Sequence, residues 1–272
     1  MQKIYITGLC LLFLFSLACS NKQYQVRTGL SGNSVKVLSF NIHHANPPSR
    51  PNVIDLDAIA NVIKQQNPDI VSLQEVDVFT LRSGKSVHQA NELARLTGMK
   101  AYFAKAIDYE GGEYGVAILS KLSMEGMKNF ALPTAEGTNG EHRTLGTAIV
   151  TLQGGKKILF GFTHLDAQRS STNRLLQIKR IAEILQPEQL PVVIAGDFNA
   201  TPQSEVINIL DSSFTRTCTS ACGFTIPVIN PNKTIDFIAY KPSVNFSVIE
   251  HKVIDEKYAS DHLPVSVVLK IK

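Results

Sequence analysis

Short apolar runs alternate along the chain with segments whose apolar residues recur at helical spacing. Runs rich in β-branched residues predict buried strands, and apolar residues three or four positions apart predict helices. The predicted strands cover residues 35–40, 70–73, 115–119, 147–152, 157–162, 191–195, 235–240 and 265–271. The predicted helices cover residues 55–66, 86–97, 171–185 and 203–210. Interleaved helices and strands indicate an α/β protein, and the glycine pair within 152–157 indicates an antiparallel hairpin.

The N-terminal segment has the pattern of an export signal. Lys3 precedes an apolar run, Ile4 to Leu17, which is too short to span a bilayer and is typical of a signal peptide. The following Ala18-Cys19 resembles the cleavage box of bacterial lipoproteins, although Leu17 stands where a smaller residue is commoner. We therefore expect a signal peptide over 1–18, a lipidated tether over 19–33 and one domain over 34–272. The alternative is a plain signal peptide in which Cys19 is incidental.

Charge and cysteine content add little about partners. The formal net charge is +4, and the Lys and Arg residues form no long basic run of the kind that marks many nucleic-acid binders. Cys218 and Cys222 are close enough in sequence to bridge in an oxidising compartment. Spacing alone leaves open whether they form a disulfide or remain two small half-buried thiols.

Polar residues recur where the predicted strands begin or end. A single such residue is usually a cap or turn former. Their recurrence at six strand ends, as carboxylates, carboxamides and imidazoles, instead predicts a functional site, because loops held by a sheet are where such sites gather. These residues are Asn41, Glu75, His164, Asp197, Asn199, Asp236, Asp261 and His262.

Taken in order, seven short motifs resemble the endonuclease/exonuclease/phosphatase superfamily, which includes DNase I, abasic-site endonucleases, neutral sphingomyelinases and inositol-polyphosphate phosphatases. The resemblance spans residues 34–272 and implies a DNase I-like, four-layered α/β sandwich of two packed mixed β-sheets flanked by helices. The motifs are Ser39-Phe40-Asn41-Ile42, Gln74-Glu75, Tyr114 to Ser120, Thr163-His164-Leu165, Gly196-Asp197-Phe198-Asn199, Ile235-Asp236 and Ser260-Asp261-His262.

The resemblance implies a metal cofactor. Hydrolysis of an anionic phosphoester needs an activated water and neutralisation of developing charge, and Mg²⁺ prefers a few oxygen ligands. Glu75 is the expected first ligand, with Asn41 and Asp261 beside it. His43 stands where some relatives carry an aspartate near the metal, which puts a second metal in doubt. Because imidazole favours transition metals, Mn²⁺ is a further candidate cofactor.

The catalytic roles are also implied by the resemblance. Asp197 resembles the family's water-orienting base, and Asn199 its partner in holding the nucleophile or the phosphate. His164 is expected to contact the phosphate or assist the leaving group. His262 is expected to donate to a phosphoryl oxygen or to act as acid or base, with Asp236 orienting its ring. The plain alternatives are an Asp-Phe-Asn turn with local hydrogen bonds and buried imidazoles with ordinary partners.

Two further residues are candidates for binding the substrate phosphate. Tyr114 could donate a hydrogen bond or be only a packing aromatic. Arg143 could bind an anion through its planar fork or be simply solvated.

We therefore expect a monomeric, exported, membrane-anchored hydrolase that acts on a small or lipid-linked phosphoester. A secreted DNase I-like endonuclease acting on nucleic acid is the main alternative. A non-catalytic binding module on the same fold is a third possibility, but such a module should have lost Glu75, Asp197 or His262, and all three are present.

Overall fold

The computed structural model describes residue 1 and residues 32–272. The predicted signal peptide, the lipidation site at Cys19 and nearly all of the predicted tether lie outside the described residues. Among the residues that are described, no helix is long and apolar enough to cross a membrane.

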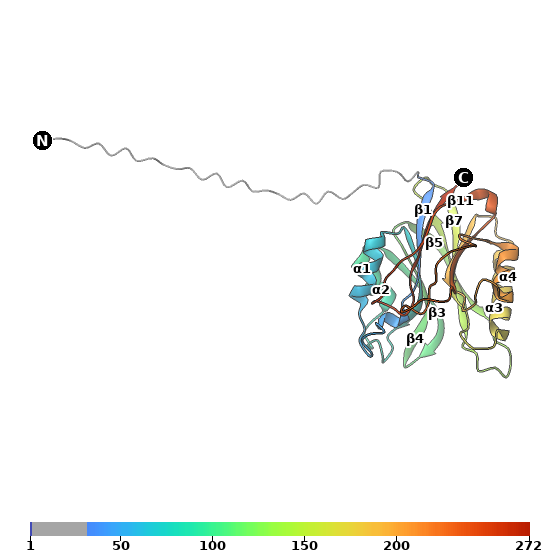
Figure 1. The fold of residues 1–272 in the computed structure, drawn as a ribbon, viewed down its shortest axis with the longest axis horizontal. Coiled ribbons are helices and arrows are strands. Elements are labelled where there is room, and N and C mark those ends of the chain that lie inside the picture. Colours follow the sequence, from blue (N-terminus) through green and yellow to red (C-terminus); the bar gives the residue numbers. More distant parts are fainter. Residues whose placement is uncertain (2–31) are drawn as a thin grey trace. The chain divides into compact units, whose positions relative to one another are not determined.

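Two six-stranded mixed sheets form the centre of the domain (Figure 1). The first sheet has the order β11-β12-β1-β2-β4-β3, in which only β1 and β2 run parallel. Its strands are β1 (Ser34–Asn41), β2 (Ile70–Val78), β3 (Lys100–Tyr109), β4 (Gly112–Ser120), β11 (Phe246–Val253) and β12 (Val265–Ile271).

The second sheet has the order β5-β6-β7-β8-β10-β9, and its only parallel pair is β7 with β8. Its strands are β5 (Ser123–Leu132), β6 (Arg143–Thr151), β7 (Lys157–His164), β8 (Val192–Asp197), β9 (Thr215–Arg216) and β10 (Asp236–Lys241). Each sheet therefore has one central parallel pair of strands, and the carboxyl ends of the two strands in a pair lie at the same end of the sheet.

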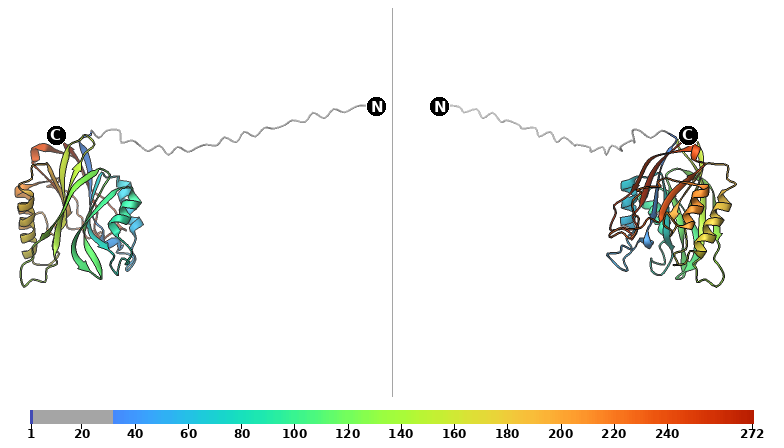
Figure 2. Two further views of the ribbon diagram at one scale, coloured as in Figure 1. Left: turned by 180° about the vertical axis from the view of Figure 1, so that it is seen from behind. Right: turned by 45° about the vertical axis from the view of Figure 1, so that its right-hand side comes forward.

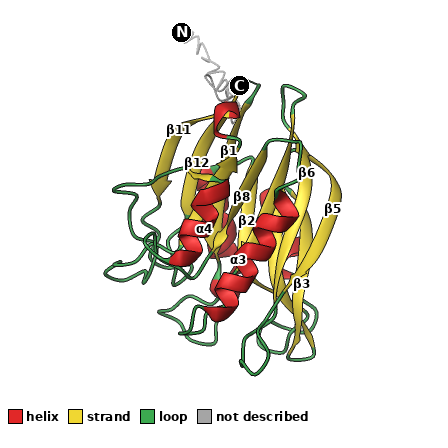
Figure 3. Cartoon of the chain, turned by 90° about the vertical axis from the view of Figure 1, so that its right-hand side faces the viewer, coloured by secondary structure: helices red, strands yellow, loops and turns green. Residues whose placement is uncertain are grey.

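Four helices cover the outer faces of the sheets. The helices α1 (Leu56–Gln66) and α2 (Gln89–Thr97) pack on the first sheet, and α3 (Thr172–Leu185) and α4 (Glu205–Ser213) pack on the second. Figure 2 shows the two sheets enclosed between the helix pairs, and Figure 3 shows α3 and α4 lying across the second sheet. The predicted four-layered α/β sandwich is confirmed.

Side-chain alternation along the strands explains the layers. In β1, Val35 and Val37 enter the core between the sheets, whereas Leu38 and Phe40 enter the core under α1 and α2. Successive side chains of a strand point to opposite faces. A strand that is apolar on both faces is therefore buried on both, as the uninterrupted apolar runs predicted.

The structure contains four strands that the hydrophobic pattern did not predict, namely β3, β5, β9 and β11. These four strands are the edge strands of the two sheets. The burial of β5 shows why, because most of its residues are exposed or half-buried. Edge strands lack a continuous apolar run, so their sequences do not differ clearly from loops.

Cys218 and Cys222 form a disulfide bond, with their Cα atoms 5.6 Å apart. The bond closes a small loop between β9 and β10. Of the two alternatives that spacing left open, the structure has the disulfide.

Candidate active site

Strand register brings the predicted site residues to one edge of both sheets. His164 at the end of β7 lies opposite Asp197 at the end of β8, and Asp236 at the start of β10 is also paired with Asp197. In the first sheet, Asn41 at the end of β1 lies opposite Gln74 of β2. Residues from distant parts of the chain therefore meet where the parallel strands end, the position expected for a site in an α/β sheet protein.

Asp197 lies at the centre of this cluster and is 1% exposed. Its Oδ2 accepts a hydrogen bond from Asn41 Nδ2 at 3.1 Å and lies 3.4 Å from His164 Nε2 and 3.7 Å from His262 Nε2. Its Oδ1 accepts from the backbone N–H of Asn199 at 2.8 Å, so the local turn proposed as the plain alternative is present as well. Burial and the nearby Asp236 carboxylate raise the pKa of Asp197 well above its usual range.

His262 and Asp236 form a buried pair. His262 Nδ1 donates to Asp236 Oδ2 at 3.0 Å, which directs Nε2 towards Asp197. Burial alone would lower the pKa of His262, but the Asp236 and Asp197 carboxylates raise it above its ordinary value. The raised pKa favours the cationic form of His262, and the hydrogen bond to Asp236 fixes the orientation of the ring.

His164 has the opposite electrostatic setting. Burial and the adjacent Arg143 guanidinium lower its pKa well below the ordinary value, so the ring is neutral. Its Nε2 lies 3.0 Å from Asn199 Nδ2, and its Nδ1 lies 3.4 Å from an Arg143 nitrogen. Arg143 is 4% exposed and also pairs with Glu141 at 3.3 Å. The two histidines thus differ in charge although both are buried beside Asp197.

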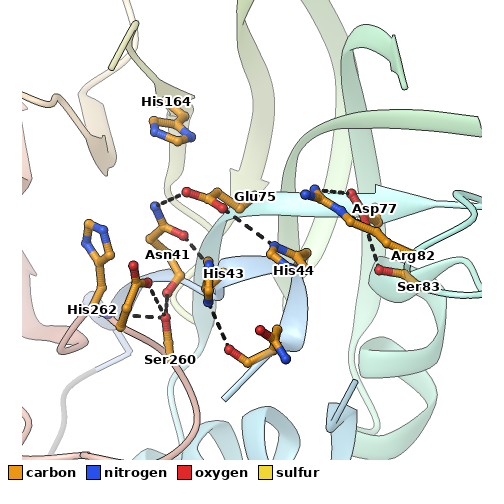
Figure 4. Close-up of polar contacts among 12 residues, drawn as sticks. Asn41, His43, His44, Glu75, Asp77, Arg82, Ser83, His164, Ser260 and His262 are labelled. Carbon is orange, nitrogen blue, oxygen red and sulfur yellow. Dashed lines mark hydrogen bonds and ion pairs between the residues drawn. The ribbon is translucent and has the colours of Figure 1, made fainter. Parts of the chain in front are cut away.

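Glu75 and Asn41 form a pair of oxygen-bearing side chains on the other sheet (Figure 4). Asn41 Nδ2 donates to Glu75 Oε1 at 3.1 Å. A bulge between Leu73 and Val76 interrupts the pairing of β2 with β4, and Glu75 has a left-handed φ of 58° there. Bulges re-aim side chains next to active sites, and this one turns Glu75 towards Asn41.

Glu75 is ionised. Burial opposes the charge, but contacts with the side chains of His44 and Asn41 outweigh it and lower the pKa of the carboxyl below its usual range. The side chain remains 22% exposed, so the carboxylate is reachable by an ion.

Asp261 and Tyr114 are joined to the site less directly. Ser260 Oγ donates to the Asn41 carbonyl at 2.7 Å and lies 3.4 Å from Asp261 Oδ1, so Ser260 links the two predicted ligands. The ring of Tyr114 lies 5.9 Å from the Arg143 guanidinium. The pKa of Tyr114 is raised by burial and by the Glu75 charge, so its hydroxyl stays protonated and able to donate.

A second group of potential metal ligands overlaps the catalytic cluster. One ligand atom each from Asp197, Asp236 and His262 lies within 4.8 Å of the others. This set differs from the predicted Glu75, Asn41 and Asp261. His262 Nδ1 and Asp236 Oδ2 in this group are bonded to each other, whereas the Glu75 carboxylate remains partly exposed.

His43 and His44 have different partners. His43 Nδ1 is bonded to the Asn46 carbonyl at 2.9 Å, and the neighbouring His44 approaches Glu75 instead. Sequence reasoning also missed Ser260 and Glu141 as partners of Asn41 and Arg143. The only signal for them was their position inside recognised motifs or beside a predicted site residue.

The comparisons with known proteins agree with the fold. The Endonuclease/Exonuclease/phosphatase family profile matches residues 38–262. No curated protein matches the chain at a significant level.

Several solved structures are similar. An endonuclease/exonuclease/phosphatase from Beutenbergia cavernae is 23% identical with a TM-score of 0.75, covering 88% of this chain and 72% of that one. A functionally unknown conserved protein from Enterococcus faecalis is 20% identical with a TM-score of 0.74, covering 87% and 100%. Mannosyl-6-phosphatase Bt3783 of Bacteroides thetaiotaomicron is 20% identical with a TM-score of 0.70, covering 86% and 99%. At these identities the structures support the shared fold alone.

Proposed function

Because the chain belongs to the endonuclease/exonuclease/phosphatase family of phosphoesterases and nucleases, we propose that it hydrolyses phosphoester bonds by attack of water on phosphorus, assisted by Mg²⁺. The observation that carries the proposal is the contact of Asp197 with both His164 and His262, which differ in charge. One buried carboxylate beside a cationic and a neutral imidazole provides a base, a charged donor and a phosphate contact within one small space.

Asp197 is the proposed base. A buried carboxylate with a raised pKa is more basic than a surface carboxylate at neutral pH and orients a water molecule through the oxygen that faces the site. The backbone N–H of Asn199 donates a hydrogen bond to Oδ1, the other oxygen of the Asp197 carboxylate. The Asn199 amide nitrogen also donates to the Leu165 carbonyl, which keeps this turn in place.

His262 is the proposed charged donor to the phosphoryl group. Asp236 fixes the ring so that the Nε2 proton points into the site, and the imidazolium opposes the negative charge that develops on the phosphoryl oxygens. Arg143 provides a second fixed positive charge, and Tyr114 beside it keeps a hydroxyl donor. These groups bind an anion without having to reorganise during the reaction.

Enzymes of this family generally depend on a divalent metal ion, and the donors at Glu75 fit one. The ionised carboxylate of Glu75, held by Asn41 and linked through Ser260 to Asp261, supplies the oxygen ligands that Mg²⁺ prefers. A bound ion would neutralise phosphate charge and lower the pKa of its water. All other steps fall to the side chains described above.

We propose a small or lipid-linked phosphoester as the substrate. The Glu110-to-Gly115 stretch resembles bacterial family members and domains linked to glycolipid-anchor processing, and one similar structure is a mannosyl-6-phosphatase. The monomeric state, the export and the anchoring through Cys19 that the sequence predicts belong to the same proposal. The disulfide between Cys218 and Cys222 supports it, because disulfides persist in oxidising compartments. Nuclease activity remains the second candidate, since the site handles the phosphate and not the attached group.

A substrate panel tests the proposal. The full-length protein, with Mg²⁺ or with EDTA, is incubated with plasmid DNA, RNA, sphingomyelin, phosphatidylinositol, inositol phosphates and sugar phosphates. Release of phosphate or head group from a small or lipid phosphoester, abolished by EDTA and restored by metal, is the expected result. DNA nicking as the dominant reaction would favour the endonuclease, and no hydrolysis with any divalent metal would contradict an enzyme.

A further inference from the structure

His44 is a site residue that the proposed hydrolysis leaves without a role. Its side chain is 15% exposed, and its Nδ1 atom is buried without a hydrogen-bond partner among the described residues. That nitrogen lies 3.8 Å from Glu75 Oε2, which is too long for a hydrogen bond. Figure 4 shows the His44 ring directed towards the Glu75 carboxylate. The nitrogen is therefore within ion-pairing distance of a carboxylate but makes no hydrogen bond, and a buried nitrogen without one is unfavourable unless it binds a ligand.

The backbone holds His44 in this position at an energetic cost. His43, His44 and Ala45 have left-handed φ angles of 46°, 43° and 61°, a region that is unfavourable for non-glycine residues. The Gln89 amide donates to the His44 carbonyl at 2.7 Å, and Ala45 N–H donates to the Ile42 carbonyl at 2.7 Å. Three consecutive strained residues that the surroundings hold in place are typical of functional sites.

Geometry and ligand chemistry suit one ion between the two side chains. Metal–nitrogen and metal–oxygen bonds to His and Glu are each about 2.0–2.2 Å. Two such bonds together exceed 3.8 Å, so a single ion can reach both His44 Nδ1 and Glu75 Oε2. An imidazole beside a carboxylate suits Mn²⁺, Co²⁺ or Zn²⁺, whereas Mg²⁺ prefers oxygen ligands alone.

We propose that His44 is a metal ligand together with Glu75, so that the site of the proposed function binds Mn²⁺ or Co²⁺ through a nitrogen ligand in addition to the oxygen ligands that Mg²⁺ uses. The inference rests on the metal site of the proposed function and names a ligand that sequence reasoning did not assign. His43 is the natural contrast, because its Nδ1 is already bonded to the Asn46 carbonyl.

The test is metal binding to full-length, metal-free protein, with His43→Ala as the matched control. Titration calorimetry measures the Kd values of Mn²⁺, Co²⁺ and Mg²⁺, and electron paramagnetic resonance of bound Mn²⁺ detects coupling to a ligand nitrogen. We expect nitrogen coupling in the native protein and in His43→Ala, and none in His44→Ala. Loss of even an outer-shell partner weakens metal affinity about 10–100-fold. His44→Ala should therefore raise the Kd for Mn²⁺ and Co²⁺ at least ~10-fold, with little change for Mg²⁺.

Two results would overturn the inference: nitrogen coupling that persists in His44→Ala, or equal Mn²⁺ affinity in His44→Ala and the native protein. His44→Asn, which tolerates a left-handed backbone, replaces His44→Ala if circular dichroism shows that the alanine variant is unfolded. The failure of this inference is distinguishable from that of the proposed function. Metal-dependent hydrolysis without nitrogen coupling removes only the role of His44, and nitrogen coupling without hydrolysis of any substrate removes only the proposed function.

Discussion

At the residue scale, the site depends on one carboxylate whose surroundings oppose its charge. Asp197 is buried beside Asp236, and the Asn41 amide, the Asn199 N–H and the nearby imidazoles of His164 and His262 stabilise its ionised form. A carboxylate needed only for structure would more commonly be paired with an arginine or lie at the surface. The basicity of Asp197 therefore comes from its surroundings, and a mutation can remove the basic carboxylate without unfolding the protein.

Asp197→Asn should retain the fold and lose activity. The amide keeps the shape of the side chain but cannot accept a proton, so kcat on the best substrate should fall by ~10²-fold or more, the usual size for a general base. The melting temperature should not fall, because the substitution removes a buried charge. Steady-state kinetics and thermal unfolding check both parts. Asp255→Asn, at an exposed side chain, is the control, and wild-type kcat in a folded Asp197→Asn protein would show that Asp197 is not the base.

Asp236 is expected to act through His262 and not on the substrate itself. Asp236→Asn removes the charge that keeps the His262 ring cationic and oriented, so kcat should fall by at least ~10-fold while KM changes less. Nuclear magnetic resonance of the metal-free protein should show an altered protonation or tautomer of the His262 ring. Asp211→Asn, which removes an ion pair with Arg216, should leave that ring unchanged. An unaltered His262 signal in Asp236→Asn would contradict the positioning role.

At the element scale, the loop between β5 and β6 carries Glu141 and leads into Arg143. Buried polar groups of α3 and of the segment after β7 hold this loop. Asn173 Oδ1 accepts from Ala135 N–H at 2.8 Å, and Asp166 Oδ1 accepts from Glu141 N–H at 3.3 Å. The position of Arg143 beside His164 thus depends on contacts far from it in sequence.

Asn173→Ala should loosen this loop. Leaving buried partners unsatisfied costs about 1–3 kcal/mol, so the free energy of unfolding should decrease by that order, and KM should rise because Arg143 is less well positioned to bind phosphate. Urea unfolding, kinetics and limited proteolysis within residues 133–142 measure the three effects. Asn208→Ala on the exposed face of α4 is the control. A loss of stability without any change in KM or proteolysis would show that the loop does not depend on Asn173.

At the scale of the whole molecule, the proposed site joins residues of both sheets. The first sheet supplies Asn41 and Glu75, and the second supplies His164, Asp197 and Asp236. The shared core between the sheets, built from residues such as Val37, Ile118, Phe160 and Phe162, keeps the two halves of the site in register. Because protein cores are densely packed, this relation is rigid.

The N-terminal cysteine gives a prediction for the intact chain. Expressed in a bacterium with lipoprotein processing, the protein should partition into membranes, and Cys19→Ala should release or mislocalise it. Cys10→Ala is the matched control, since Cys10 lies within the predicted signal peptide. Membrane fractionation and mass spectrometry of the mature N-terminus check the outcome. Any mature N-terminus other than a lipid-modified Cys19 would refute the anchor and leave the proposed activity untouched.

The sequence by itself determined the central elements of this protein. Strands buried on both faces and helices with one apolar face carry strong local patterns, so β1, β8 and α3 were predictable within a few residues, and the start of β2 was predictable as well. The polar residues at the strand ends indicated a site, and ordered motifs indicated the family. The edge strands β3, β5, β9 and β11 were not predictable, because half-exposed strands have no distinctive period.

Only the tertiary structure decided how the site residues meet. Strand register placed His164 and Asp236 on either side of Asp197, and burial together with neighbouring charges made one imidazole neutral and the other cationic. Sequence spacing could not tell which of His43 and His44 faces Glu75, because that choice follows from the left-handed turn and the β2 bulge. Local composition sets which elements form, whereas pKa values and ligand geometry depend on groups brought together from the whole chain.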